Sequence, residues 1–101
     1  MGMGNLAKMA QQMQADMARV EQELRDLQIE GSAGGGVVKA VVTGKQEIVS
    51  LTIDPGVVDP DDVEMLQDLV VAAVGDALSN ARQAAEQKVS RVTGGLQIPG
   101  L

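Results

Sequence analysis

The segment from Gly35 to Ala77 limits the fold of this chain more than any other part of the sequence. It opens with glycines, continues through two short runs rich in β-branched residues, and reaches a stop at Ile53-Asp54-Pro55. β-Branched side chains favour strands, and glycine allows the chain to reverse. A cluster of acids then introduces a long run of apolar residues and alanines, which favours a helix. We therefore expect an α+β fold in which a strand hairpin precedes a long helix.

An antiparallel sheet is predicted over residues 28–53. Residues 37–43 and 47–53 are the best strand candidates, because both are rich in β-branched side chains. Gly44-Lys45-Gln46 forms the hairpin turn between them. Residues 28–33 are short and polar, and we place a first strand there, ahead of a triple-glycine turn.

The two faces of this sheet are not cleanly divided into an apolar and a polar side. In the last strand, strict alternation would put Val49, Leu51 and Ile53 on one face. The same alternation would put Ile48 on the other face. Because the helices can cover only one face, we expect apolar surface to remain exposed in a single chain. This pattern favours a partner subunit.

Two helices flank the predicted sheet. Residues 5–28 form an amphipathic helix in which apolar residues recur at spacings of three and four. The members of this seam are Leu6, Ala10, Met13, Met17, Val20, Leu24 and Leu27. Residues 60–92 form the second helix, with Asp59 as its N-cap and Thr93-Gly94-Gly95 as its stop. We expect the seam to pack within its own chain; the alternative is that it also meets a partner chain.

The first half of the long helix is apolar on nearly every side, between residues 63 and 78. A helix that is apolar all round is buried all round, and one small sheet cannot cover it. The chain also lacks aromatic residues, which would bury the most area in a core of its own. We therefore expect a homodimer. The candidate interface residues are Val63, Leu66, Leu69, Val70, Val74 and Leu78.

Several classes of function are disfavoured by missing residue types and spacings. The chain has no cysteine and no histidine, so Ser-His-Asp, Cys-His and the common zinc sites cannot be built. The glycine runs lack the spacing of a phosphate-binding loop, and the acids of residues 59–64 lack that of a calcium loop. We expect no enzyme, no cofactor and no metal site. No apolar run is long enough for a signal peptide or a membrane span, so we expect a cytoplasmic protein without membrane contact.

The charge of the chain restricts how it could bind nucleic acid. Fourteen acids outweigh eight bases, and the net charge of −6 disfavours indiscriminate binding to DNA. Residues 79–93 nevertheless carry three bases and one acid. Matching of the helix dipole explains this excess in one chain, whereas a symmetric dimer would double it into a phosphate-binding patch. The candidate DNA contacts are Lys8, Arg19, Arg25, Arg82, Lys88 and Arg91.

Five short motifs are spread over the whole chain. They are residues 8–14 (KMAQQMQ), 34–39 (GGGVVK), 53–55 (IDP), 64–70 (EMLQDLV) with the following Ala72-Ala73, and 94–100 (GGLQIPG). Each motif is short, but their order and spacing together are specific. In this combination the chain resembles the YbaB/EbfC family of bacterial nucleoid-associated proteins.

The resemblance implies a single domain over residues 1–101, made of a helix, a three-stranded antiparallel sheet, a long helix and a tail at residues 93–101. It also implies a homodimer whose outer helices project like the arms of tweezers. The implied partner is double-stranded DNA in the nucleoid, with effects on nucleoid organisation and gene expression, and we expect binding mainly through phosphates. The alternative is an acidic protein-interaction module for replication or recombination partners, with weak or no DNA binding.

Overall fold

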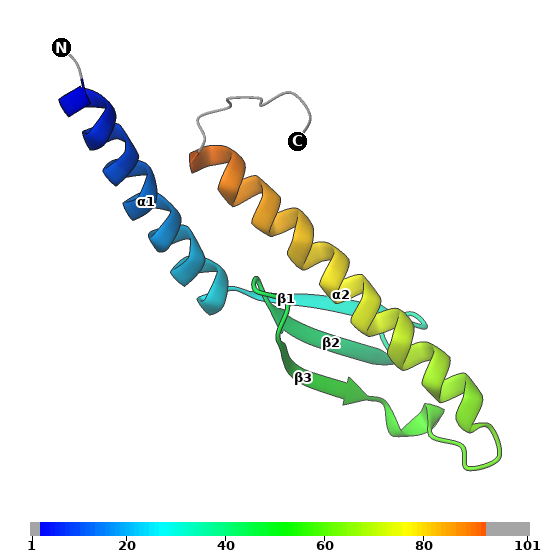
Figure 1. The fold of residues 1–101 in the computed structure, drawn as a ribbon. Helices are drawn as coiled ribbons and strands as arrows, with labels where there is room; N and C mark the ends of the chain where they lie inside the picture. The colour runs from blue at the N-terminus through cyan, green and yellow to red at the C-terminus, as the bar shows by residue number, and fades with distance from the viewer. Residues whose placement is uncertain (1–2, 93–101) are drawn as a thin grey trace.

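The computed structural model describes residues 3–92, and it confirms the predicted α+β order of helix, three-stranded antiparallel sheet and long helix (Figure 1). The predicted tail at residues 93–101 lies outside the described residues. The elements are α1 (Met3–Asp26), β1 (Gln28–Ala33), β2 (Val38–Thr43), β3 (Ile48–Ile53), the short 3-10 turn η1 (Pro55–Val57) and α2 (Val63–Val92). The strands lie in the order β1-β2-β3, and both pairs are antiparallel.

The molecule is elongated, with a sheet-containing body at one end and two helical arms at the other (Figure 1). Its radius of gyration is 19.3 Å, whereas a compact domain of this length has a radius of about 13 Å. The body consists of the sheet and the first half of α2. The arms are α1 and the second half of α2, and α2 runs through Gly75 as one helix.

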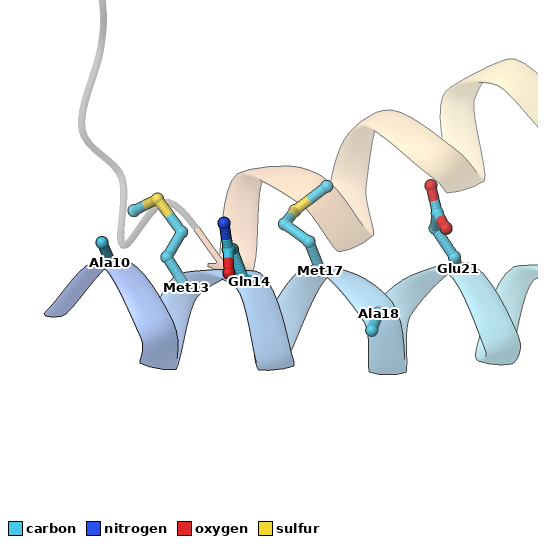
Figure 2. A pocket seen from close by; sticks show the side chains of 6 residues that line it. All are labelled: Ala10, Met13, Gln14, Met17, Ala18 and Glu21. Carbon is cyan, nitrogen blue, oxygen red and sulfur yellow. The ribbon is translucent and has the colours of Figure 1, made fainter. Parts of the chain in front are cut away.

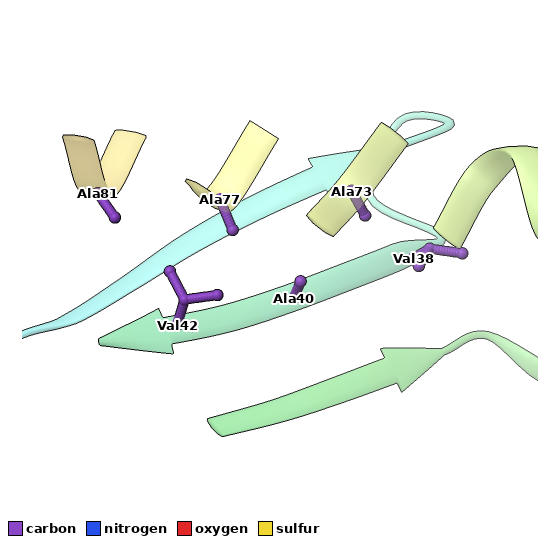
Figure 3. Close-up of a cluster of buried hydrophobic side chains, with 6 residues drawn as sticks. All are labelled: Val38, Ala40, Val42, Ala73, Ala77 and Ala81. Atoms are coloured by element: carbon purple, nitrogen blue, oxygen red, sulfur yellow. The ribbon is translucent and has the colours of Figure 1, made fainter. Parts of the chain in front are cut away.

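The core of the body is a row of small side chains between α2 and the sheet. α2 lies across β1 and β2, so that one face of β2 meets one stripe of the helix (Figure 3). The fully buried members are Val38, Ala40 and Val42 from β2 and Ala73, Ala77 and Ala81 from α2. On α2 only alanines are completely buried within the chain, and Leu69, Val70, Val74 and Leu78 are partly buried around them. The large apolar residues of α2 stay candidates for a dimer interface.

The buried alanines of α2 can lie directly against the sheet because Gly31 of β1 has no side chain. A Cβ atom built on Gly31 would lie 2.7 Å from the carbonyl oxygen of Ala73, and it would lie closer still to the backbone of Ala77. The backbones of β1 and α2 are therefore in direct contact. Two side chains of α2 complete this contact by bonding to the outer edge of β1. The Asp76 carboxylate accepts a hydrogen bond from the Ser32 amide at 3.0 Å, and the Asn80 side-chain amide donates to the Glu30 carbonyl at 3.1 Å.

Strand β3 is not covered by α2, and one of its residues lies on a different face from the one predicted. Ala40 pairs with Leu51 and Val42 pairs with Ile48, so Ile48 and Leu51 both lie on the helix-facing side of the sheet. Strict alternation had separated them, and that prediction was wrong. The reason is a β-bulge at Val49, which adds one residue to β3 and shifts its register against β2. The side chains of Ile48 and Leu51 remain exposed.

The start of α2 also differs from the prediction, which had placed Asp59 as the N-cap and the first helical residue at position 60. The helix begins at Val63, and the carboxylate of Asp62 accepts from the Met65 amide at 3.2 Å, as a capping residue does. The carboxylate of Asp59 accepts from the Asp61 amide at 2.9 Å and so closes a tight turn before the helix. Aspartate can support either arrangement, and here the local turn prevails.

Candidate nucleic-acid interface

The arms enclose a small cleft where α1 and α2 run beside each other. Its volume is about 200 Å³. Its lining combines two apolar residues with charged residues of both signs. The lining residues are Asp16, Arg19, Val20 and Glu23 from α1 and Lys88, Arg91 and Val92 from α2. Val20 is almost fully buried and joins the two helices, while the charged side chains form the open rim.

The charges of the cleft are organised around Glu23. Its carboxylate lies 3.2 Å from Nζ of Lys88 and 3.8 Å from Nε of Arg19, so it links the two arms. A second acid, Asp16, lies 3.3 Å from Nη1 of Arg19. The Arg19 side chain is 63% exposed and that of Lys88 is 26% exposed. Ion pairs as exposed as these contribute little to stability, about 0–1 kcal/mol each, so their partners can exchange.

Four of the arm bases, Lys8, Arg25, Arg82 and Arg91, have no carboxylate within ion-pair distance among residues 3–92, and two of them are exposed arginines of α2. Neither Arg82 nor Arg91 lies within ion-pair distance of a carboxylate among residues 3–92. Both side chains belong to exposed residues of α2. A guanidinium with open donors binds a phosphate through two parallel hydrogen bonds, and no ion pair has to be broken first. These two arginines are therefore the groups best prepared for an external anion.

The six predicted DNA-contact residues are only partly brought together. Arg19, Lys88 and Arg91 line the cleft, as described above. Lys8 is exposed two turns beyond Asp16 toward the start of α1, and it does not line the cleft. Arg25 lies in the last turn of α1, where its guanidinium donates to the Gln22 side chain at 3.1 Å. Arg82 is exposed on α2 outside the cleft.

Sequence reasoning missed the two acids that share the cleft with these bases. Asp16 and Glu23 stand three residues before and four residues after Arg19. Residues at these spacings lie on the same face of a helix, so the local pairing could have been found from sequence. The ion pair between Glu23 and Lys88 could not have been found from sequence, because it depends on how α1 and α2 lie against each other.

The candidate dimer residues are placed on both sides of α2 in the body. Leu69, Val70, Val74 and Leu78 pack partly on the core of their own chain, Leu66 is half-buried, and Val63 is exposed. The sequence-based candidates left out Val71, whose side chain is among the most exposed apolar groups of the structure at 72%. They also left out Ile48 and Leu51 of the uncovered strand β3. The interface itself stays a prediction.

Residues 3–92 hold no group of three or more acidic, cysteine or histidine side chains that could bind a metal ion. Within that range, no helix has the length and apolar character that crossing a bilayer requires.

Comparison with known proteins assigns the chain to a family. The model of the YbaB/EbfC DNA-binding family matches residues 1–96. The chain belongs to this family. It is 56% identical to a protein of Acetivibrio thermocellus called nucleoid-associated protein, over 96% of this chain and 87% of that one. A Moorella thermoacetica protein of the same name is 50% identical, and the match covers 99% of both chains.

A solved structure shares the fold. The crystal structure of the uncharacterized protein HP0035 from Helicobacter pylori superposes with a TM-score of 0.68. The match covers 94% of this chain and 96% of that one, at 23% sequence identity. At this level of identity the likeness supports the helix, sheet and helix arrangement only.

Proposed function

We propose that this protein is a nucleoid-associated DNA-binding protein of the cytoplasm that acts as a homodimer. The observation that carries the proposal is the set of bases on the arms, where Arg82 and Arg91 have open guanidinium groups although the chain as a whole is acidic. Membership of a DNA-binding family and the name shared by its relatives support the same function.

The binding mode that fits these residues is contact with the phosphate backbone. Arg82 and Arg91 offer donors for phosphate oxygens. The chain has no aromatic residue that could stack on a base, and the acids at the cleft rim would repel a deeply inserted strand. Phosphate contacts position a protein on DNA without reading its sequence. We therefore expect binding with little dependence on base sequence and a steep dependence on salt.

Dimerisation would allow an acidic chain to bind DNA. Ile48 and Leu51 of β3 and Val71 of α2 are exposed apolar side chains of the body, and a second copy would remove such groups from water. Two copies related by a twofold axis would present two sets of arms and double the number of arm bases. We propose that the bodies of the two copies pack against each other, which leaves the arms available to bind DNA.

The proposal can be tested by comparing two double variants that change charge equally. R82E/R91E changes the net charge of the arms by −4, and K39E/K45E changes that of the sheet and its hairpin by the same amount. Lys88 is left unchanged because its ion pair with Glu23 links the two arms. Lys39 and Lys45 are paired with Glu30 and Glu21, so sedimentation has to show that K39E/K45E keeps its fold. Each protein is titrated into a fluorescein-labelled duplex at low salt, and the fluorescence anisotropy is followed.

The expected result is loss of binding in R82E/R91E and retained binding in K39E/K45E, with both variants sedimenting like the wild type. Equal loss in both variants would mean that only net charge matters, and the assignment to the arms would be wrong. Full binding by R82E/R91E would also reject it.

A second function has one observation in its favour. The apolar residues Leu6 and Met9 are each 68% exposed on α1, and the chain is acidic overall. These features would suit a protein partner from the replication or recombination machinery. If wild-type protein fails to bind any duplex at low salt and forms a stoichiometric complex with one such partner, this function replaces DNA binding.

A further inference from the structure

The sheet has two edge strands, and their outer edges differ in sequence and in hydrogen bonding. β1 and β3 flank β2, and each has one side on which no further strand of the sheet lies. Such an edge offers a row of main-chain donors and acceptors to any other extended chain. Proteins usually protect an edge with charged side chains, proline or a covering element. An edge without this protection is a place where a second chain can pair.

The β1 edge is closed by two side chains of α2. Asp76 and Asn80 stand one helical turn apart and therefore share one face of α2. The Asp76 carboxylate accepts from the Ser32 amide at 3.0 Å. The Asn80 side-chain amide donates to the Glu30 carbonyl at 3.1 Å. An adjacent antiparallel strand would supply the same two groups, a carbonyl oxygen and an N–H, so these side chains take the place of a fourth strand.

The β3 edge carries neither kind of protection. β3 reads IVSLTI, without a charged residue or a proline. The Asp54 amide donates to the Val37 carbonyl at 2.8 Å, so these two residues form a hydrogen-bonded pair. Because such pairs alternate, the main-chain groups of Leu51 and Ile53 point away from β2. Among residues 3–92, no hydrogen bond reaches these groups, and the outer edge of β3 is open to another strand.

The sequence of β3 is also complementary to itself. If two β3 strands pair antiparallel with Leu51 at the centre, the two leucines lie opposite each other. Ser50 of each copy then lies opposite Thr52 of the other. Apolar groups meet apolar groups, hydroxyls meet hydroxyls, and no like charges are opposed. Both copies make the same contacts, as a twofold axis requires, so a second copy of this chain fits the edge.

We propose that Asp76 and Asn80 keep the β1 edge closed to other chains, so that two copies pair through β3 alone and the assembly ends at two. With both edges open, each copy could accept a strand on either side, and the sheet could grow without limit. The closure of β1 is argued from the contacts of one chain. The pairing at β3 rests on the proposed homodimer.

Two matched double variants of the full chain test the closure of β1. D76A/N80A removes both side chains that bond to the β1 edge. Q83A/E86A removes one amide and one carboxylate from exposed positions of the same helix. In D76A/N80A, the Ser32 amide should exchange with solvent about tenfold faster, and sedimentation should show species larger than two copies that increase with concentration. Q83A/E86A should match the wild type in both measurements.

Single variants separate the hydrogen bonds from charge and from general loss of structure. D76N keeps an acceptor oxygen, so the Ser32 amide should stay protected and the assembly should stay at two copies. N80D replaces the donor by an acceptor, and it should give larger species even if D76A/N80A loses the protection of its β2 amides. Unchanged Ser32 exchange in D76A/N80A, or the absence of larger species in both D76A/N80A and N80D, would overturn the proposal.

Association through another surface is recognised by the matched control. Among the described residues, α1 carries an open groove lined by Ala10, Met13, Gln14, Met17, Ala18 and Glu21 (Figure 2). The groove lies on an arm and contains none of the substituted residues. Larger species that form through it would therefore appear equally in D76A/N80A and Q83A/E86A, and this result would also reject the closure of β1.

The Leu51 amide tests the pairing at β3 separately. If two copies pair there, this amide should be protected in the wild-type dimer and should lose its protection on dilution to single chains. A dimer whose Leu51 amide exchanges as fast as that of an unstructured peptide would reject β3 as the contact. If the wild type sediments as a single chain, the proposed homodimer is wrong, whereas the Ser32 amide and the mass of D76A/N80A still decide the closure of β1.

Discussion

The body and the arms of this protein are held together by opposite means. In the body, α2 touches β1 at Gly31, and fully buried alanines fill the narrow space between helix and sheet. In the arms, α1 and α2 meet at the buried Val20 and through a rim of exposed ion pairs around Glu23. The small side chains of the body pack well at only one distance between α2 and the sheet. The arms use side chains that can change partners.

This difference explains how a chain without aromatic residues can combine a defined fold with an adaptable surface. Close backbone approach gives dense contact without large side chains, and such packing does not tolerate added atoms. Exposed ion pairs contribute little to stability, so replacing a carboxylate by a phosphate at Lys88 or Arg19 would change the fold little. The binding function is therefore expected on the arms and the folding stability on the body.

The largest expected effect comes from adding one methyl group to the closest contact of the body. G31A would place a Cβ against the backbones of Ala73 and Ala77, which cannot move away independently of α2. We expect a loss of about 3 kcal/mol or more in the free energy of unfolding. Urea denaturation followed by circular dichroism measures it.

The same substitution in an arm provides the control for G31A. G4A adds a methyl group on α1 where nothing lies within 4 Å. We expect an unchanged or slightly higher free energy of unfolding. If G31A and G4A behaved alike, the close contact between β1 and α2 would not determine the stability of the body.

Replacing a buried valine by alanine in the body and in the arms should have smaller effects, and these should differ between the two regions. Val38 of β2 and Val20 of α1 are both buried, the first in the body and the second in the arm contact. V38A should lower the global free energy of unfolding by about 2 kcal/mol. V20A should mainly accelerate hydrogen exchange in the arm half of α1 and leave the β2 amides protected. Equal loss of β2 protection in both variants would show that the arms and the body unfold as one unit.

The smallest predicted effect concerns the acid that bridges the arms. E23Q removes the carboxylate that binds Lys88 and Arg19, and so frees Lys88 for phosphate, whereas Arg19 keeps its ion pair with Asp16. We expect DNA affinity at low salt to rise about threefold, since an exposed ion pair contributes less than about 1 kcal/mol. E47Q, which removes one negative charge from the hairpin, should change affinity less. An affinity of E23Q at or below that of E47Q would mean that Glu23 does not compete with DNA.

The order of elements was predictable from the sequence, because strand and helix signals are local. β-Branched runs marked β2 and β3, and the three-four spacing marked α1. The face of Ile48 was not predictable, because the bulge at Val49 is defined by pairing with β2. The burial of the alanines required knowing that Gly31 lies under α2. At the candidate site, the bases could be named from sequence, but their sharing of one cleft with Glu23 depends on the approach of two distant helices.

We claim that the arms bind DNA through phosphates, and this predicts that wild-type binding weakens steeply with salt. Anisotropy titrations over a range of salt concentrations give the slope of log K against log salt. If Arg82 and Arg91 of two chains each contact one phosphate, the slope should be about −3.6, and it should approach zero in R82E/R91E. A wild-type slope near zero, or the same steep slope in the variant, would contradict the claim.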